Sequence, residues 1–560
     1  MPINSRWSIP LPQVSLPTWV FQSAQEVGLD HKVFIDADKP ERFLTYSGYL
    51  LLSKRIALGL ERAGLEHGDR VLLFSGNDVL YPAIVLGVMM AGGVFTGASP
   101  AFTSRELAYQ LQDSAASFLL TASGALDTAL DAAAQAGVPR SRIYLYDGLT
   151  DYPSSQPPTE VKHWTSLLAT AGEAENFQWY ESSDPRQTTC ALNYSSGTTG
   201  KPKGVEITHF AYVANGETGI HQQRLHFEAH GEPYQGRALC FAPLCHAAAQ
   251  TTYMANYPKL GISTYIMGSF NFVKMLEHIQ NHKITELFTA PPIVAAMATS
   301  PLCAKYNLDS VKSAISGTAP LDLELAKRFN KLWPNGKVTL RQGWGMTELT
   351  CVGSIDDPRQ GSGLPSIGEA APNVVVKLMN EGREVTTPKQ RGELWVSTPT
   401  VMKGYWRNPK ATEETLVRQD GVTWLKTGDI AEVESFEPGA KIYIVDRMKE
   451  LIKVKGFQVA PAELENLLRT REDVVDAGVV GVVIDGAEWP RAYVVKSAGS
   501  KVTEQEIEKW IDERVAKYKR LAGGVAFIDA IPRLQSGKMV RRVLKERAKN
   551  EVKQLKAKLA

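Results

Sequence analysis

The sequence of 560 residues lacks most of the features that mark secreted, disulfide-bonded or nucleic-acid-binding proteins. Its five cysteines are odd in number and include no C-x-x-C pair, so they indicate neither a disulfide framework nor a zinc site. Charge of one sign is not in excess either, because 62 Lys and Arg stand against 60 Asp and Glu. We therefore expect a reducing compartment and no nucleic-acid partner.

Long apolar runs are also missing. The best candidate for a membrane span is the segment 83–98, which is shorter than the roughly 20 residues a bilayer requires and is rich in glycine. We predict a buried helix there instead of a stable membrane span. The first 20 residues contain four prolines and no apolar stretch behind a basic start, so they do not resemble a signal peptide.

What the chain does contain is ample material for large apolar cores, since 44% of its residues are hydrophobic and 22% are charged. A chain of this length predicts at least two domains. Strand and helix patterns alternate without an internal repeat, which favours an α/β architecture. Four segments carry the clearest local patterns: a strand at 71–75, a helix at 81–90, a surface loop at 152–160 and a strand at 442–445.

A change of pattern after the last of these strands predicts a domain boundary, with a large domain at 1–446 and a small α+β domain at 447–560. Within the small domain we expect strands at 474–483 and 492–495. An amphipathic helix should follow, with Thr503 and Glu506 spaced as a capping box at its start. One face of this helix should carry Ile507, Trp510, Ile511, Val515 and Tyr518.

The strongest local signal is the segment 194–204, with the sequence YSSGTTGKPKG, which follows a predicted strand at 189–192. Glycines allow the backbone to turn its N–H groups inward, and hydroxyls and lysines add further donors, which together suit a polyphosphate. The spacing is not that of a Walker A loop, because Gly197 and Gly200 are too close and Pro202 follows Lys201. Taken alone, the segment is equally consistent with a flexible surface hairpin.

Further motifs follow in a fixed order, and with them the chain resembles the adenylate-forming superfamily of acyl-CoA synthetases, coumarate-CoA ligases, adenylation domains and luciferases. The resemblance implies a large domain of layered α/β subdomains and a small mobile α+β domain. It also implies ATP, Mg²⁺ and coenzyme A as cofactor and co-substrates. The motifs are 316–320 (SGTAP), 342–348 (QGWGMTE), 404–406 (GYW), 408–409 (NP), 426–429 (KTGD), 446–453 (DRMKELIK) and 536–538 (SGK).

Joining a carboxylate to the α-phosphorus of ATP requires groups that hold the triphosphate, a metal and the developing charge. Glu348 is the best carboxylate for Mg²⁺, and Asp429 and Arg447 suit the nucleotide unless they simply form a salt bridge with each other. By resemblance, the other nucleotide-binding residues are Ser195, Ser196, Gly197, Thr198, Thr199, Gly200, Lys203, Gly317, Thr318, Ala319, Pro320, Gln342, Gly343, Trp344, Gly345, Met346 and Thr347.

The small domain supplies the remaining catalytic candidates by resemblance alone. Lys538 matches the lysine that contacts both the carboxylate and the α-phosphate, although a lone lysine in a basic tail would ordinarily be called solvated. Lys449 matches the hinge about which the small domain rotates. Lys453 and Gln458 match residues near the reacting acyl group, and Lys455 and Gly456 would lie along the pantetheine path.

The acid pocket is expected around His246, whose alternative interpretation is a core or capping histidine. Plant coumarate-CoA ligases carry a tyrosine where this chain has Ala248, and a lysine where it has Ile315, so polar partners for a ring hydroxyl are missing. An aryl-acetic, cinnamic-type or medium-chain fatty acid would suit such a pocket. Its other predicted members are Ala247, Cys351 and Val352.

These observations predict an AMP-forming acid–CoA ligase that acts as a monomer or homodimer on a small carboxylic acid. The alternatives are a luciferase-like oxygenase, a stand-alone enzyme that loads a carrier protein, and a catalytically silent nucleotide-binding protein. Residues 557–559 (AKL) resemble a peroxisomal signal but are followed by Ala560. Because that signal is read at the free terminus, we expect a cytoplasmic protein, and a peroxisomal one only if residue 559 is the native end.

Overall fold

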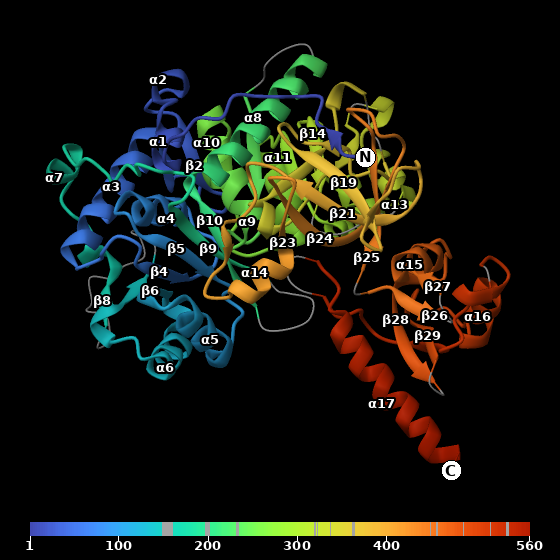
Figure 1. The fold of residues 1–560 in the computed structure, drawn as a ribbon. Helices are drawn as coiled ribbons and strands as arrows, with labels where there is room; N and C mark the ends of the chain where they lie inside the picture. Colours follow the sequence, from blue (N-terminus) through green and yellow to red (C-terminus); the bar gives the residue numbers. More distant parts are fainter. Residues whose placement is uncertain are drawn as a thin grey trace.

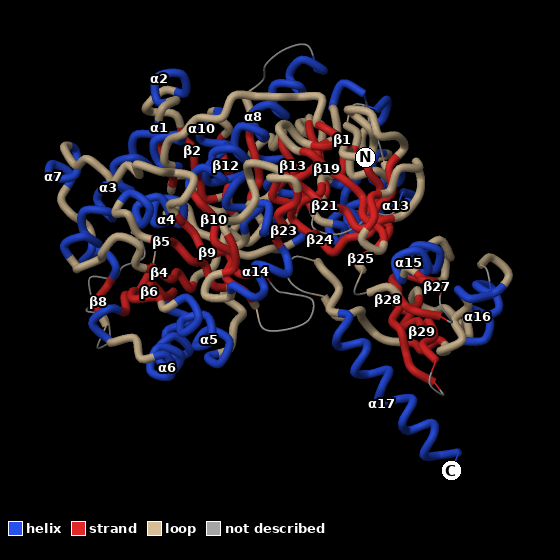
Figure 2. Tube along the Cα trace, viewed as in Figure 1, coloured by secondary structure: helices blue, strands red, loops and turns tan. Residues whose placement is uncertain are grey.

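The computed structural model shows a large body that contains most of the chain and a smaller C-terminal unit beside it (Figure 1). Strands lie mainly inside the large body and helices lie mainly around them (Figure 2). The described residues are 1–147, 161–195, 202–230, 235–317, 321, 323–336, 338–360, 364–448, 450–454, 457–484, 487–515, 517–533 and 537–559. The predicted loop at 152–160 lies outside these ranges.

The first sheet orders eight strands in the described part of the chain as β22-β10-β9-β5-β4-β6-β7-β8. The pairs from β9 to β8 are parallel, whereas β10 runs antiparallel to both β9 and β22. The strands are β4 (Arg70–Phe74), β5 (Val94–Ala98), β6 (Ala116–Ala122), β7 (Ile143–Tyr146), β8 (Lys162–His163), β9 (Thr189–Ser195), β10 (Lys203–Thr208) and β22 (Gly404–Tyr405).

Helices cover both faces of this sheet, as expected for parallel strands whose side chains are buried on both sides. Leu72 and Phe74 of β4 pack with residues of α5 and α6 on one face, and Val71 and Leu73 pack with α3 and α4 on the other. The predicted helix over 83–98 is wrong in its second half. The helix ends at Met90, the glycine pair 92–93 follows, and residues 94–98 form the buried strand β5.

The second sheet has the order β15-β14-β13-β11-β12-β2-β3 in the described residues. All of its pairs are parallel except the edge pair of β2 with β3. The strands are β2 (Lys32–Asp36), β3 (Phe43–Thr45), β11 (Arg237–Cys240), β12 (Ser263–Ile266), β13 (Glu286–Thr289), β14 (Ser313–Ser316) and β15 (Leu340–Gln342).

A third sheet is antiparallel and follows the order β1-β19-β21-β24-β23, with β20 on β19 and β25 on β24. A short three-stranded sheet, β16-β17-β18, lies between the second and third sheets in sequence. The strands are β1 (Ile3–Asn4), β16 (Trp344–Gly345), β17 (Val352–Ile355), β18 (Glu369–Ala370), β19 (Val375–Asn380), β20 (Arg383–Glu384), β21 (Gly392–Ser397), β23 (Leu416–Gln419), β24 (Val422–Val433) and β25 (Ile442–Arg447).

The C-terminal unit has hydrophobic clusters of its own, which start at Ile452 and include no residue from the large body. The predicted strands are confirmed as β28 (Val474–Ile484) and β29 (Ala487–Lys496), which pair in one sheet with β30 (Val525–Phe527). A separate hairpin joins β26 (Ile452–Val454) to β27 (Phe457–Val459). This unit is therefore a small α+β domain with an independent core.

The capping box of the predicted amphipathic helix is confirmed, because Thr503 and Glu506 exchange side-chain and backbone hydrogen bonds at its start. The helix ends at Asp512, earlier than expected, so Val515 and Tyr518 lie beyond it.

No helix within the described ranges is long and apolar enough to cross a membrane. The helices are α1 (Leu16–Phe21), α2 (Ala24–Val27), α3 (Tyr46–Arg62), α4 (Tyr81–Met90), α5 (Ser104–Ser114), α6 (Leu126–Ala136), α7 (Ala171–Glu175), α8 (His209–His230), α9 (Ala247–Ala249), α10 (Tyr257–Leu260), α11 (Phe272–Asn281), α12 (Pro291–Thr299), α13 (Leu323–Asn330), α14 (Pro409–Thr415), α15 (Pro461–Arg469), α16 (Glu504–Asp512) and α17 (Arg541–Leu559).

Candidate active site

The parallel strands of the second sheet bring three predicted segments to one edge. Strands β11, β13, β14 and β15 are neighbours and run in the same direction. The segment with His246 follows β11, Ile315 and Gly317 lie at the end of β14, and Gln342 ends β15. Since ligands of parallel sheets bind beyond the carboxyl ends of the strands, this edge is the expected place for a substrate site.

The predicted phosphate-binding loop joins β9 to β10, at the carboxyl end of a strand that is parallel to β5. Ser195 pairs with Lys203 across the two strands, so the described residues enter and leave the loop side by side. Two contacts to α5 hold the entry and exit: the Tyr194 hydroxyl donates to the Asp113 carboxylate at 2.6 Å, and the Tyr109 hydroxyl donates to the Pro202 carbonyl at 2.8 Å.

The backbone around Glu348 is tightly constrained. After the short 3-10 turn Thr347–Leu349, Thr350 adopts φ +65°, which is unusual for a β-branched residue and costs on the order of 1–3 kcal/mol. The buried Thr350 hydroxyl donates to the Thr400 carbonyl at 2.9 Å, and the Met402 N–H donates to the Glu348 carbonyl at 2.9 Å. The segment 400–402 therefore fixes the direction in which Glu348 points.

The Glu348 side chain is only 7% exposed and accepts a hydrogen bond from the Tyr405 hydroxyl at 2.9 Å. The Lys203 ammonium lies over the ring of the same tyrosine, 4.6 Å from its centroid. The described residues contain no cluster of three or more His, Cys, Asp or Glu that could hold a metal by themselves. One buried carboxylate beside a phosphate loop nevertheless fits Mg²⁺, which usually takes its other ligands from phosphate oxygens and water.

Asp429 and Arg447 face each other on paired strands, β24 and β25. Their atoms Oδ1 and Nε lie 3.3 Å apart, so the salt bridge named above as the alternative is present in the structure. The Trp344 indole N–H donates to the other oxygen of Asp429 at 2.9 Å. Burial raises the pKa of the Asp429 carboxyl, and Arg447 and Trp344 oppose that shift. A carboxylate has further acceptor capacity, so ribose hydroxyls could still bind.

Lys538 of the small domain reaches this cluster. Burial and the nearby Arg447 lower the pKa of its ammonium to about 8, while the carboxylates of Glu450, Asp429 and Glu348 act in the opposite direction. The lysine is thus a half-buried cation held among the groups of the large domain. The alternative of a fully solvated tail lysine does not describe this geometry.

The close approach of the two domains depends on the glycine that precedes Lys538. Gly537 has φ +82°, and a Cβ atom at this position would lie 2.7 Å from the Cγ atom of Pro292 in α12. Only glycine tolerates both the backbone conformation and the contact. The turn is held from within the small domain, because Arg533 donates to the Gly537 carbonyl at 3.0 Å and pairs with Asp476 at 2.9 Å.

His246 precedes α9 and makes no side-chain capping bond, which removes one of the alternative interpretations. Its side chain is solvent-exposed, yet the surrounding protein lowers the pKa of its imidazole by desolvation. The side chain therefore keeps contact with solvent while protein atoms surround much of it. The imidazole is therefore expected to be neutral at pH 7.

The other predicted members of the acid pocket follow His246 directly, lie on β14 or follow Glu348 in the chain. Ala247 is buried, whereas Ala248, Ile315, Cys351 and Val352 are partly exposed. Burial raises the pKa of the Cys351 thiol to about 12, which disfavours the thiolate form. The nucleotide motif packs directly on this segment, since a Cβ atom on Gly345 would lie 1.7 Å from the Cys351 carbonyl oxygen. Three further predicted residues directly follow strands: Gly317 follows β14, Gly343 follows β15 and Met346 follows β16.

Several predicted residues lie outside the described part of the chain. The backbones of Lys453 and Gln458 pair across the hairpin of β26 and β27, but their side chains are not described. The remaining residues whose placement is not described are Ser196, Gly197, Thr198, Thr199, Gly200, Thr318, Ala319, Pro320, Lys449, Lys455 and Gly456.

Sequence reasoning missed the residues that hold these groups in place. Tyr405 was part of a recognised motif but had no assigned role, and its spacing in the motif was the only available signal. Tyr109, Asp113 and Pro292 carry no signal in the sequence, because each acts through a contact between distant segments.

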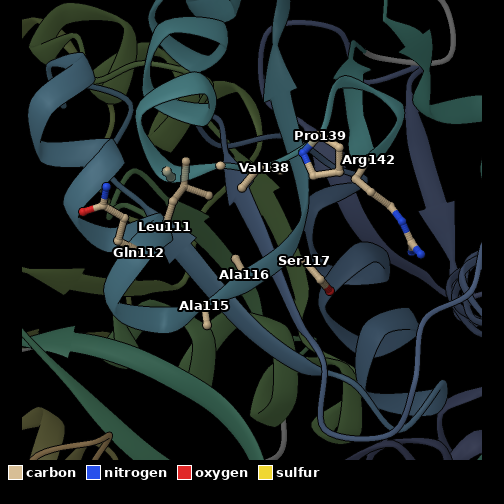
Figure 3. Close-up of a pocket in the computed structure, with 10 residues that line it drawn as sticks. Leu111, Gln112, Ala115, Ala116, Ser117, Val138, Pro139 and Arg142 are labelled. Carbon is tan, nitrogen blue, oxygen red and sulfur yellow. The ribbon is translucent and has the colours of Figure 1, made fainter.

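A separate groove lies beside α5 and α6, lined among others by Leu111, Ser117, Val138 and Arg142 (Figure 3). It is next to the first residues of β6, at the amino ends of the parallel strands. Ser195 and Lys203, the described residues that flank the phosphate loop, lie at the opposite edge of the same sheet, so this groove is not part of the candidate active site.

Comparison with known proteins identifies the family of the chain. The model of the AMP-binding enzyme family matches residues 20–406, and that of the AMP-binding enzyme C-terminal domain matches residues 463–538. The chain belongs to the AMP-binding enzyme family. This member is 36% identical to a phenylacetyl-CoA ligase of Aspergillus niger, over 96% of the chain and 98% of the relative. It is also 36% identical to 4-coumarate–CoA ligase 1 of Petroselinum crispum, over 96% of both proteins.

Solved structures share the fold of this AMP-binding enzyme over nearly its whole length. ATP-bound MatB from Rhodopseudomonas palustris has a TM-score of 0.82 at 24% identity, over 95% of the chain and 99% of MatB. The anthranilate CoA ligase AuaEII in complex with anthranoyl-AMP has a TM-score of 0.82 at 20% identity, over 97% and 99% of the two chains. The predicted α/β architecture with a small C-terminal domain is therefore confirmed.

Proposed function

We propose that this AMP-binding enzyme is an acid–CoA ligase that works in two steps. A carboxylate oxygen attacks the α-phosphorus of ATP, the bond to the β-phosphate oxygen breaks, and acyl-AMP and pyrophosphate form. The sulfur of coenzyme A then attacks the acyl carbon, the thiol proton is released, and AMP leaves. The observation that carries the proposal is the position of Lys538 among Asp429, Arg447 and Glu348.

The first step requires positive charge more than it requires a base, because a carboxylic acid is already ionised at pH 7. Lys538 and Arg447 supply two cations where charge develops on the α-phosphate, in a half-buried place where such interactions are strong. Asp429 accepts from the ribose hydroxyls while Trp344 and Arg447 hold it in place. Glu348 would hold Mg²⁺, which neutralises phosphate charge when bound.

The acid is proposed to lie beside His246, with its acyl group against Ala247, Ala248 and Ile315. These side chains offer apolar surface, which supports an aryl or medium-chain acid. Two relatives point the same way, since their names include phenylacetyl-CoA and 4-coumarate. A neutral His246 can share a hydrogen bond with the substrate but adds no charge.

Coenzyme A is the proposed acceptor, and the second step requires the small domain to turn. We place the boundary between residues 446 and 447 and the hinge at Lys449, as the sequence predicts. Rotation there would carry Lys538 away from the nucleotide and bring the hairpin of β26 and β27, with Lys453 and Gln458, toward it. In this proposal Lys538 serves the first step, and Lys453 and Gln458 take its place in the same site for the second step.

The test is a panel of acids, including phenylacetate, cinnamate, coumarate and straight-chain fatty acids, scored for AMP release that depends on both ATP and coenzyme A. An aryl or medium-chain acid should support release of AMP and formation of its CoA thioester. A purified carrier protein in place of coenzyme A serves as the competing acceptor. Release of AMP with the carrier protein alone would contradict the choice of acceptor, and no release with any acid would contradict the ligase assignment.

A further inference from the structure

The hydroxyl of Tyr405 holds the carboxylate of Glu348 in one orientation. Both side chains are buried, with 8% and 7% of their surfaces exposed, and their oxygens lie 2.9 Å apart. An ionised carboxylate only accepts hydrogen bonds, so the tyrosine is the donor. None of the described residues donates to the other oxygen of Glu348, Oε2. Among the described residues, the contact thus occupies one carboxylate oxygen and leaves the second without a donor.

Strand register places this tyrosine beside β10, the strand that begins where the phosphate loop ends. Tyr405 in β22 pairs with Val205 in β10, two residues after Lys203 at the start of the same strand. The Lys203 ammonium lies 4.6 Å from the centre of the Tyr405 ring. One side chain thus contacts the carboxylate through its hydroxyl and the phosphate-loop lysine through its ring.

We propose that Tyr405 is a positioning residue for the metal site: its hydroxyl holds Glu348 in the orientation in which the other carboxylate oxygen would accept a cation bound together with ATP. This inference rests on the proposed function, because it assigns Glu348 to the metal. Groups that orient a metal ligand matter nearly as much as the ligand, and their loss typically costs about 10- to 100-fold in metal affinity. We expect a loss of metal affinity of the same size when the Tyr405 hydroxyl is removed.

The experiment measures nucleotide binding by calorimetry, with and without metal. The probes are Mn²⁺ with α,β-methylene-ATP, and the same nucleotide in EDTA. Tyr405→Phe keeps the ring under Lys203 and removes only the hydroxyl. It should lower the affinity for the Mn²⁺ nucleotide roughly 10- to 100-fold and change the affinity for the metal-free nucleotide less than about twofold. A general loss of structure would weaken both.

The matched control is Tyr443→Phe, which removes another tyrosine hydroxyl that donates to a glutamate, in an exposed contact with Glu434 at the opposite end of β25 from Arg447. It should change neither affinity. A second control places Tyr405→Phe in a Glu348→Ala background, where it should have no further effect because the two residues act as a unit. Thermal unfolding of each variant checks that it is folded.

Three results with Tyr405→Phe would overturn the inference: equal loss of both affinities, no loss of the metal-dependent affinity, or an undiminished effect in the Glu348→Ala background. If Glu348→Ala itself keeps full metal dependence, the metal assignment is wrong and the role of Tyr405 falls with it. These measurements need no acid and no coenzyme A. Their results can therefore be interpreted even if the acid panel contradicts the ligase assignment.

Discussion

Replacing Lys538 by alanine is the sharpest perturbation of the proposed mechanism. The change removes one of two cations near the α-phosphate, and loss of a single charge-stabilising group typically costs about 10²- to 10³-fold in rate. Because Arg447 remains as the second cation, we expect a loss at the lower end of this range, about 10²-fold in the rate of adenylation. The carboxylates of Asp429 and Glu450 also lose a counter-charge, so the KM for ATP should rise.

The assay separates the two half-reactions. Adenylation is followed by pyrophosphate release in the absence of coenzyme A, and thioester formation starts from purified acyl-AMP. Lys538→Ala should slow the first and leave the second largely intact. Lys549→Ala, an exposed lysine on α17, the helix that follows Lys538 in the chain, is the control and should change neither. An equal loss in both half-reactions would refute the role assigned to Lys538.

The pH dependence follows from the same lysine. Its pKa is lowered to about 8 in the folded protein, so the ammonium loses its proton as the pH rises through that value. The kcat/KM for adenylation should therefore fall above about pH 8, whereas thioester formation should show no such decrease.

The same lysine affects stability. Between its pKa of about 8 in the folded protein and the ordinary pKa of 10.5, the unfolded chain binds more protons, so this group makes folding more favourable as the pH rises through that window.

Three further changes test the hinge, the domain contact and the acid pocket. Lys449→Pro fixes φ and should slow thioester formation while adenylation stays near normal; equal rates in both steps would contradict the hinge. Gly537→Ala adds a Cβ atom 2.7 Å from Pro292 and should slow adenylation roughly 10- to 100-fold, since displacement of a reacting group by about 1 Å has such effects. Unchanged pyrophosphate release would show that the contact is not needed. In the acid pocket each added methylene should gain about 0.8 kcal/mol, roughly fourfold in kcat/KM, until the space is full. Ala248→Tyr should penalise the bulkiest acids by roughly 1 to 3 kcal/mol, and a tenfold preference of the unchanged enzyme for coumarate would refute an apolar pocket.

Motif spacing identified the family because the chemistry demands particular residues within short segments. Glycines and hydroxyls near 195–204, the acid in the turn at Glu348 and the paired Asp429 and Arg447 are all local patterns. The alternation of strand and helix likewise predicted the α/β class, and strands such as β4, β25 and β28 were located within a residue or two. Local periodicity was ambiguous at 83–98, where a buried helix and a buried strand are both continuously apolar.

What the sequence alone determined about this protein is therefore its fold class, its family and the residue types that meet ATP. Only the tertiary structure decided which other side chains hold these ATP-binding residues in position. Tyr405 meets Glu348 across 57 residues because β22 pairs with β10, and Lys538 meets Asp429 because Gly537 can approach Pro292. Such contacts depend on strand register and on the packing of separate domains. No periodicity within one segment encodes them, because both partners must first be folded.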